Sequence, residues 1–213
     1  MATSDVTRFF GAEDRAEIKA AVGEAERRTS GEIVPYAVNA CDDYEVARWR
    51  GAALGAMGCG LLAAAVHYFG GYWGALLDLW IAVPPAIGAG FGYLAAAASP
   101  AVRRALIPAD VLDERVRQRA TTAFLEQEVF DTRERTGILI FVALFERRVV
   151  VLGDAGINAK VAQHEWDDVV ASIVAGIRAK TPGRAMAAGI RACGALLERP
   201  GITRRAADTD ELA

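Results

Sequence analysis

Three aspartates have the residue type and surroundings that best suit metal chemistry in this chain. Asp42 and Asp43 are adjacent in a polar loop after an apolar segment, and Asp154 follows another apolar segment between Gly153 and Gly156. Carboxylate oxygens are the ligands that hard cations prefer, so Ca²⁺ or Mg²⁺ is the cofactor that these residues would bind. A structural alternative stays open for each, because such an aspartate can cap a helix and an acidic pair can simply form a solvated loop.

The sequence carries no motif for nucleophilic or nucleotide chemistry. It has no GxxxxGK[S/T], no GxSxG and no CxxC, and its cysteines, at positions 41, 59 and 193, lack the spacing of a metal site. Catalytic residues therefore cannot be named from motifs. The net charge of -3 gives no global basic field, so nucleic acid is not an expected partner.

The elements that must position the aspartates follow an α/β pattern. Hydrophobic periodicity and turn signals predict, in order, a helix over 13–28, a strand over 32–38, a helix over 109–130, strands over 137–144 and 148–152, and helices over 164–179 and 184–198. The short link between the last two strands makes them an antiparallel pair, and the apolar run 137–144 is typical of a strand covered on both faces. The fold class expected is α/β, a small mixed sheet with helices on both faces.

A long apolar insertion interrupts this pattern. Between Gly51 and Val102 the only formally charged residue is Asp78, and a membrane-spanning helix needs about 20 apolar residues. The sequence therefore predicts a transmembrane helical hairpin over 48–104, with spans over about 51–69 and 79–98. The alternative is a pair of buried helices in a soluble protein. On the first interpretation, residues 1–47 and 105–200 form one discontinuous domain and 201–213 form a polar tail.

Arginines at the two ends of the hairpin predict its orientation. Arg48 and Arg50 precede the first span, and Arg103 and Arg104 follow the second. Basic flanks favour the cytoplasmic side, so both termini are expected in the cytoplasm and the protein in a bacterial-type inner membrane with two spans.

Four glycines predict close helix contacts within the membrane. Gly51 and Gly55 in the first span, and Gly88 and Gly92 in the second, each form a small-xxx-small pair. Such pairs let helix backbones approach closely. The pairs can serve to pack the two spans against each other, or to join two copies of the chain in a homo-oligomer.

Three stretches of the soluble segments resemble the TPM domain family, named for a thylakoid lumen phosphatase, a photosystem II repair protein and a nematode receptor modulator. They are residues 25–34 (AERRTSGEIV), 137–144 (GILIFVAL) and 146–157 (ERRVVVLGDAGI). The resemblance implies an α/β sandwich. It links the chain to acid phosphatase activity, to binding of divalent cations, and to assembly or repair of membrane complexes.

Two hypotheses for function follow from the residues and the resemblance together. The first is a membrane-anchored TPM-like module without enzymatic activity, whose partners are the lipid bilayer and a membrane protein or a second copy of the chain. The alternative is a divalent-cation-dependent acid phosphatase that uses Asp42, Asp43 and Asp154. The first is preferred because Arg133 and Arg135 lie in the loop where a further cation ligand is expected, and arginine repels a cation.

Overall fold

The computed structural model describes residues 3–29, 31–70, 77–132 and 135–198. The predicted polar tail, most of the predicted turn between the two spans, and Arg133 lie outside these residues. The chain divides into two compact units, one formed by Met1–Cys41 with Asp113–Ala213 and the other by Asp42–Leu112.

The first unit is built on a three-stranded mixed sheet. The strands β1 (Ile33–Val38), β2 (Ile138–Ala143) and β3 (Arg148–Gly153) lie in the order β1-β2-β3. β1 pairs with β2 in parallel and β2 pairs with β3 in antiparallel, so the predicted hairpin of the last two strands is confirmed. The helices of this unit are α1 (Thr3–Phe9), α2 (Ala12–Glu26), α6 (Ala109–Glu126, whose first turn belongs to the second unit), α7 (Ala155–Asn158), α8 (Gln163–Arg178) and α9 (Pro182–Leu197).

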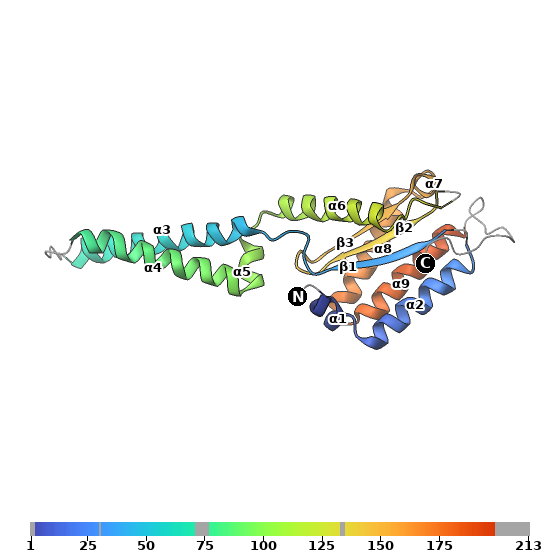
Figure 1. Ribbon diagram of the computed structural model, residues 1–213, viewed down its shortest axis with the longest axis horizontal. Helices are drawn as coiled ribbons and strands as arrows, with labels where there is room; N and C mark the ends of the chain where they lie inside the picture. The colour runs from blue at the N-terminus through green and yellow to red at the C-terminus, as the bar shows by residue number, and fades with distance from the viewer. Residues whose placement is uncertain (1–2, 30, 71–76, 133–134, 199–213) are drawn as a thin grey trace. The chain divides into compact units, whose positions relative to one another are not determined.

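Helices cover both faces of the sheet, which confirms the expected α/β fold class. Figure 1 shows α6 on one side of the strands and α2, α8 and α9 on the other. All six residues of β2 are buried, as its unbroken apolar sequence requires. The side chains alternate along the strand. Ile138, Ile140 and Val142 enter the core under α2, α8 and α9, whereas Leu139, Phe141 and Ala143 pack beneath α6.

This alternation fixes the register of the sheet. A shift by one residue would exchange the two sets of side chains between the faces, and each set fits a different layer. The layer beneath α6 is shallow because that helix contributes mainly Val116, Ala120 and Ala123. α6 ends at Glu126, four residues before the predicted end, and Glu128 has a positive φ of 51° that a continuing helix does not allow.

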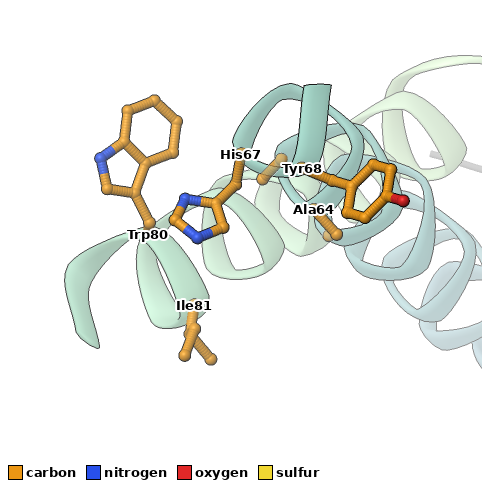
Figure 2. A pocket seen from close by; sticks show the side chains of 7 residues that line it. Ala64, His67, Tyr68, Trp80 and Ile81 are labelled. Carbon is orange, nitrogen blue, oxygen red and sulfur yellow. The ribbon is translucent and has the colours of Figure 1, made fainter. Parts of the chain in front are cut away.

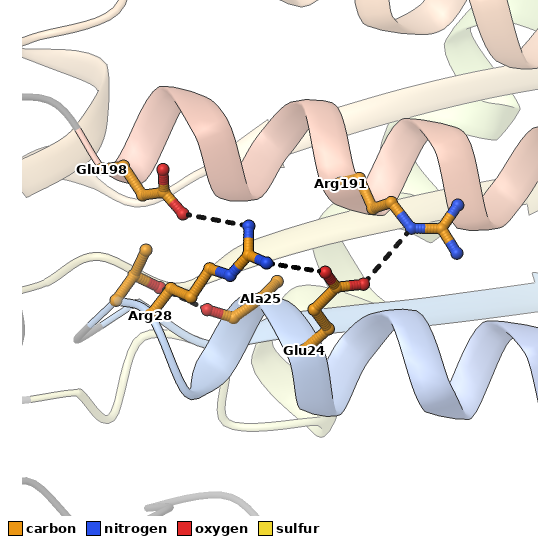
Figure 3. Close-up of polar contacts among 6 residues, drawn as sticks. Glu24, Ala25, Arg28, Arg191 and Glu198 are labelled. Atoms are coloured by element: carbon orange, nitrogen blue, oxygen red, sulfur yellow. Dashed lines mark hydrogen bonds and ion pairs between the residues drawn. The ribbon is translucent and has the colours of Figure 1, made fainter.

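α2 and α9 lie side by side on the other face. Gly194 allows their close approach, because a Cβ added there would come within 3.0 Å of the Cβ of Ala25. Ion pairs lie on the exposed edge of this contact (Figure 3). The Glu24 carboxylate accepts from Arg28 at 2.9 Å and from Arg191 at 3.4 Å. Such exposed pairs contribute little to stability, so the apolar contact beneath them holds the two helices.

The second unit is a helical hairpin. α3 (Glu45–Gly70) and α4 (Leu77–Ala98) are its two long helices, and α5 (Pro100–Ala105) follows at the end of α4. α3 begins six residues before the predicted first span, because residues 45–50 continue the helix beyond the apolar run. α5 was not predicted as a separate helix. It begins after Ser99, whose Oγ accepts from the backbone N–H of Val102 at 3.4 Å.

Candidate functional site

The outward surface of α3 and α4 is the most unusual surface in the described residues. Sixteen of the 19 exposed large hydrophobic residues in the described part of the chain lie on these two helices. Each helix is long and apolar enough to cross a membrane, and only 11% of each apolar window is buried. A contiguous apolar surface of this kind marks contact with a membrane or another protein, since monomeric soluble proteins rarely expose one.

The four predicted glycines face one another along the contact between α3 and α4. A Cβ added to Gly51 would collide with the carbonyl group of Gly92, and a Cβ added to Gly55 would collide with that of Gly88. In the reverse direction, a Cβ added to Gly92 would collide with the carbonyl group of Gly51, and one added to Gly88 with that of Gly55. The helices therefore approach backbone to backbone at this seam, and the geometry uses all four glycines inside the hairpin.

Aromatic side chains lie near both ends of the hairpin. At one end the rings of Trp49 and Tyr93 meet edge to face with centroids 5.5 Å apart, and at the other end Tyr68 lies beside Phe69 at 5.1 Å. Trp49 and Tyr68 are 19 residues apart in α3. That separation is about 28 Å along a helix axis and matches the roughly 30 Å of a bilayer's hydrocarbon core. Tryptophan and tyrosine favour the two membrane–water boundaries.

A pocket opens between α3 and α4 near Trp80 (Figure 2). Its volume is about 630 Å³. The lining residues are Gly60, Ala63, Ala64, His67, Tyr68, Trp80 and Ile81. Figure 2 shows the ring of His67 from α3 and that of Trp80 from α4 among the side chains that line the pocket. The small residues of α3 create the hollow, and its walls suit an apolar group better than a charged one.

Asp154 is held by two structural interactions at the end of β3. Its Oδ1 accepts from the backbone N–H of Ala155 at 2.6 Å, which makes Asp154 the cap of α7. The guanidinium of Arg135 donates to the same carboxylate through Nε at 2.7 Å and through Nη2 at 3.0 Å. The Asp154 side chain is only 5% exposed, so both its oxygens are engaged in a confined space.

Arg135 therefore has a role that the sequence did not reveal. The hydrogen bonds that Arg135 donates to Asp154, and then the negative charge of that carboxylate, raise the pKa of Arg135, although 59% of the arginine side chain is exposed. The guanidinium occupies one side of the carboxylate, where a cation bound to Asp154 would otherwise lie. The strand register could have predicted this pair, because it places Gly137 beside Asp154, whose N–H donates to the Gly137 carbonyl at 2.9 Å.

Asp42 and Asp43 follow the other end of the sheet. Asp154 comes after Gly153, opposite Ile138, at the end where β1 begins, whereas the loop to Asp42 leaves after Val38, where β1 finishes. The Asp42 Oδ1 accepts from the backbone N–H of Asp43 at 2.6 Å, so this carboxylate shapes its own loop. Within the described ranges, no three His, Cys, Asp or Glu residues gather in a way that could hold a metal ion. A cation shared by the three aspartates stays a prediction.

Comparison with known proteins supports the fold. The model of the TPM domain family matches residues 100–196. The structure is also similar to the NMR structure of the BA42 protein from the psychrophilic bacterium Bizionia argentinensis, with 20% sequence identity and a TM-score of 0.57 over 96% of this chain and 91% of that one. No curated protein matches the chain. The family match begins after the AERRTSGEIV motif, and the pairing of β1 with β2 joins that motif to the same domain.

Proposed function

We propose that this chain, which carries a TPM domain, is a membrane-anchored TPM protein whose hairpin α3–α4 crosses the bacterial inner membrane. The domain then works at the cytoplasmic face, as an auxiliary module of a membrane partner and without catalytic turnover. The single observation that carries this proposal is the outward apolar surface of α3 and α4, combined with the glycine seam that packs them against each other.

Lipid is the occupant that fits this surface best. Exposed apolar residues lie along the length of both helices of the hairpin, the aromatic residues mark a thickness close to that of a bilayer, and arginines flank the ends that are joined to the TPM domain. A protein partner would ordinarily cover one face of the hairpin, whereas a bilayer covers every face between the two aromatic boundaries.

The sheet supports an even number of spans. β1 precedes the hairpin and β2 follows it, and the two strands are hydrogen-bonded neighbours. Both strands must therefore lie on the same side of any membrane that the intervening residues 39–137 cross. Two spans satisfy this condition, and the basic flanks favour the cytoplasm as the side that they share.

The environment of Asp154 supports a role without catalysis. Metal-dependent hydrolysis of a phosphoester needs a cation that activates water and neutralises the phosphoryl charge. The Asp154 carboxylate is already bound to the Arg135 guanidinium and to the N–H of Ala155. A divalent cation would have to displace the arginine and overcome its repulsion.

Two measurements test the membrane proposal. Alkaline carbonate extraction of membranes should leave the full chain in the pellet, and recovery in the supernatant would refute the anchor. A reporter that is active only in the cytoplasm should work when fused after Ala213, and one that is active only in the periplasm should not. The reverse result would refute the proposed orientation.

Catalysis is tested with the full chain in detergent. The purified protein should show no Mg²⁺- or Ca²⁺-dependent hydrolysis of a generic phosphomonoester. Hydrolysis that disappears in folded Asp42→Ala, Asp43→Ala or Asp154→Ala variants would establish the phosphatase alternative instead.

A further inference from the structure

The end of the hairpin that joins the TPM domain gathers four arginines from two helices. Arg48 and Arg50 flank Trp49 in α3, and Arg103 and Arg104 occupy the last turn of α5. α5 packs against both α3 and α4. The Nη1 of Arg50 donates to the backbone carbonyl of Leu106 at 2.9 Å, which ties α3 to the end of α5.

The contact between α3 and α4 indicates how far the four arginines lie from the apolar part of the hairpin. Gly51 faces Gly92 and approaches Ala96, so Ser99 and α5 begin about one helical turn beyond that contact. Trp49, whose ring meets Tyr93, marks the expected boundary of the hydrocarbon. The four arginines therefore lie at the depth where lipid headgroups carry their phosphates.

Arg48 has donor capacity that the described residues do not use. It is half-buried in α3, and Ala47 and Gly51 in the same part of the helix are buried. Its Nε is buried and has no hydrogen-bond acceptor among the described residues. A buried donor without an acceptor destabilises the structure, so an acceptor brought by a ligand would relieve that cost by drawing the guanidinium toward it.

The acidic residues next to the arginines of α3 stand before them in the chain. Glu45 begins α3 one turn before Arg48, and Asp42 and Asp43 precede the helix. Each of the three precedes Arg48 in the chain, on the side away from the apolar run.

We propose that Arg48, Arg50, Arg103 and Arg104 bind the headgroup phosphate of an anionic phospholipid. Arginine forks suit this ligand, since they form paired hydrogen bonds with phosphate oxygens, and basic pockets between membrane helices bind anionic headgroups. The inference rests on the proposed function, because lipid reaches the cluster only if α3 and α4 span the bilayer. The inference adds one thing to the proposed anchor: the class of lipid that holds the hairpin at a fixed depth in the membrane.

The test uses the full chain reconstituted in phosphatidylcholine vesicles with trace amounts of spin-labelled lipid. The fraction of immobilised label should be higher for phosphatidylglycerol than for phosphatidylcholine. Arg103→Gln combined with Arg104→Gln should reduce this preference by about fivefold for each arginine that contacts the headgroup. The matched control, Arg178→Gln combined with Arg184→Gln, changes the net charge equally on exposed positions of α8 and α9 and should keep the preference.

A second pair of variants separates charge from disruption. Arg103→Lys combined with Arg104→Lys retains the charge and should retain most of the preference, whereas equal losses in the lysine and glutamine variants would overturn the proposal. Removal of the preference by inorganic phosphate would also overturn it, because the site would then serve a free anion.

Carbonate extraction of the same vesicles distinguishes this inference from the anchor itself. Integrated protein with equal affinity for both lipids refutes only the headgroup site. Protein that is extracted refutes the anchor, and the headgroup site falls with it.

Discussion

A charge at the centre of α4 should prevent the hairpin from staying in the bilayer. Ile87 lies at the middle of Leu77–Ala98 and is 51% exposed on the outward surface. Ile87→Arg therefore places a guanidinium against lipid tails, far from either headgroup region. The same substitution at Leu125 is a matched control, because this leucine is 59% exposed but lies on α6 in the other unit.

The size of the effect follows from the position of Ile87. An isoleucine at the centre of a span favours insertion by about 0.3–0.6 kcal/mol, and an arginine there opposes it by about 2.5–3.5 kcal/mol. The exchange should cost about 3–4 kcal/mol, which lowers the insertion equilibrium by roughly two to three powers of ten. Leu125→Arg removes an exposed apolar side chain from a water-facing helix, so it should leave insertion unchanged.

Carbonate extraction and flotation of membranes measure this difference. Wild type and Leu125→Arg should float with the membranes, and a large share of Ile87→Arg should move to the soluble or aggregated fraction. Ile87→Arg could instead float as fully as wild type while its α4 still crosses the membrane. The outward surface of α4 around Ile87 would then not face hydrocarbon, and the predicted insertion cost would be refuted.

Three further predictions concern packing, capping and pH. Gly88→Ala should destabilise the detergent-solubilised protein by about 1–3 kcal/mol in thermal unfolding, whereas Gly90→Ala should not, because a Cβ at Gly90 meets open space. Asp154→Ala should lower the free energy of unfolding in denaturant by about 1 kcal/mol through the lost cap of α7, and an unchanged value would refute the capping role. Burial raises the pKa of the Cys193 thiol from 9.0 to about 12. The unfolded chain therefore loses this proton first, and the free energy of unfolding should fall as pH rises from about 9 toward 12, with no such contribution in Cys193→Ala.

The long apolar or periodic segments were the parts of the fold that the sequence could predict. The run 137–144 contains no polar side chain that could face water, and β2 is buried on both faces. Trp166, Val169 and Ile173 recur at helical spacing, and all three are buried in α8. In both cases a single physical requirement, removal of apolar surface from water, determines the structure.

The short elements could not be predicted in this way. α1 has seven residues and α7 has four, so neither completes enough turns for a periodic pattern. α1 is fixed by tertiary contacts instead, since Val6 and Phe9 pack against the main core and the ring of Phe9 meets that of Phe10 edge to face. α7 depends on the cap at Asp154, a signal that a turn or a metal ligand would also give.

The candidate site shows the same limit at the level of side chains. The sequence identified Arg135 as a charge that opposes a cation, but not as the partner of Asp154, 19 residues away. That contact depends on the register of β2 against β3, which the link between the strands determines. The same limit applies to the four glycines of α3 and α4. Their spacing predicts close contact with another helix, but it does not indicate whether that helix belongs to the same chain or to a second copy.

The glycine seam also explains how a sheet can tolerate a long helical hairpin between two of its paired strands. Residues 39–137 separate β1 from β2, and the entropic cost of closing a loop grows with its length. Contact between Gly51 and Gly92, near the base of α3 and α4, removes most of the hairpin from that loop. Each halving of a loop reduces the closure cost by only about 0.6 kcal/mol, so the greater gain is geometric. The chain leaves the hairpin near the place where it entered, beside the contact between Gly51 and Gly92.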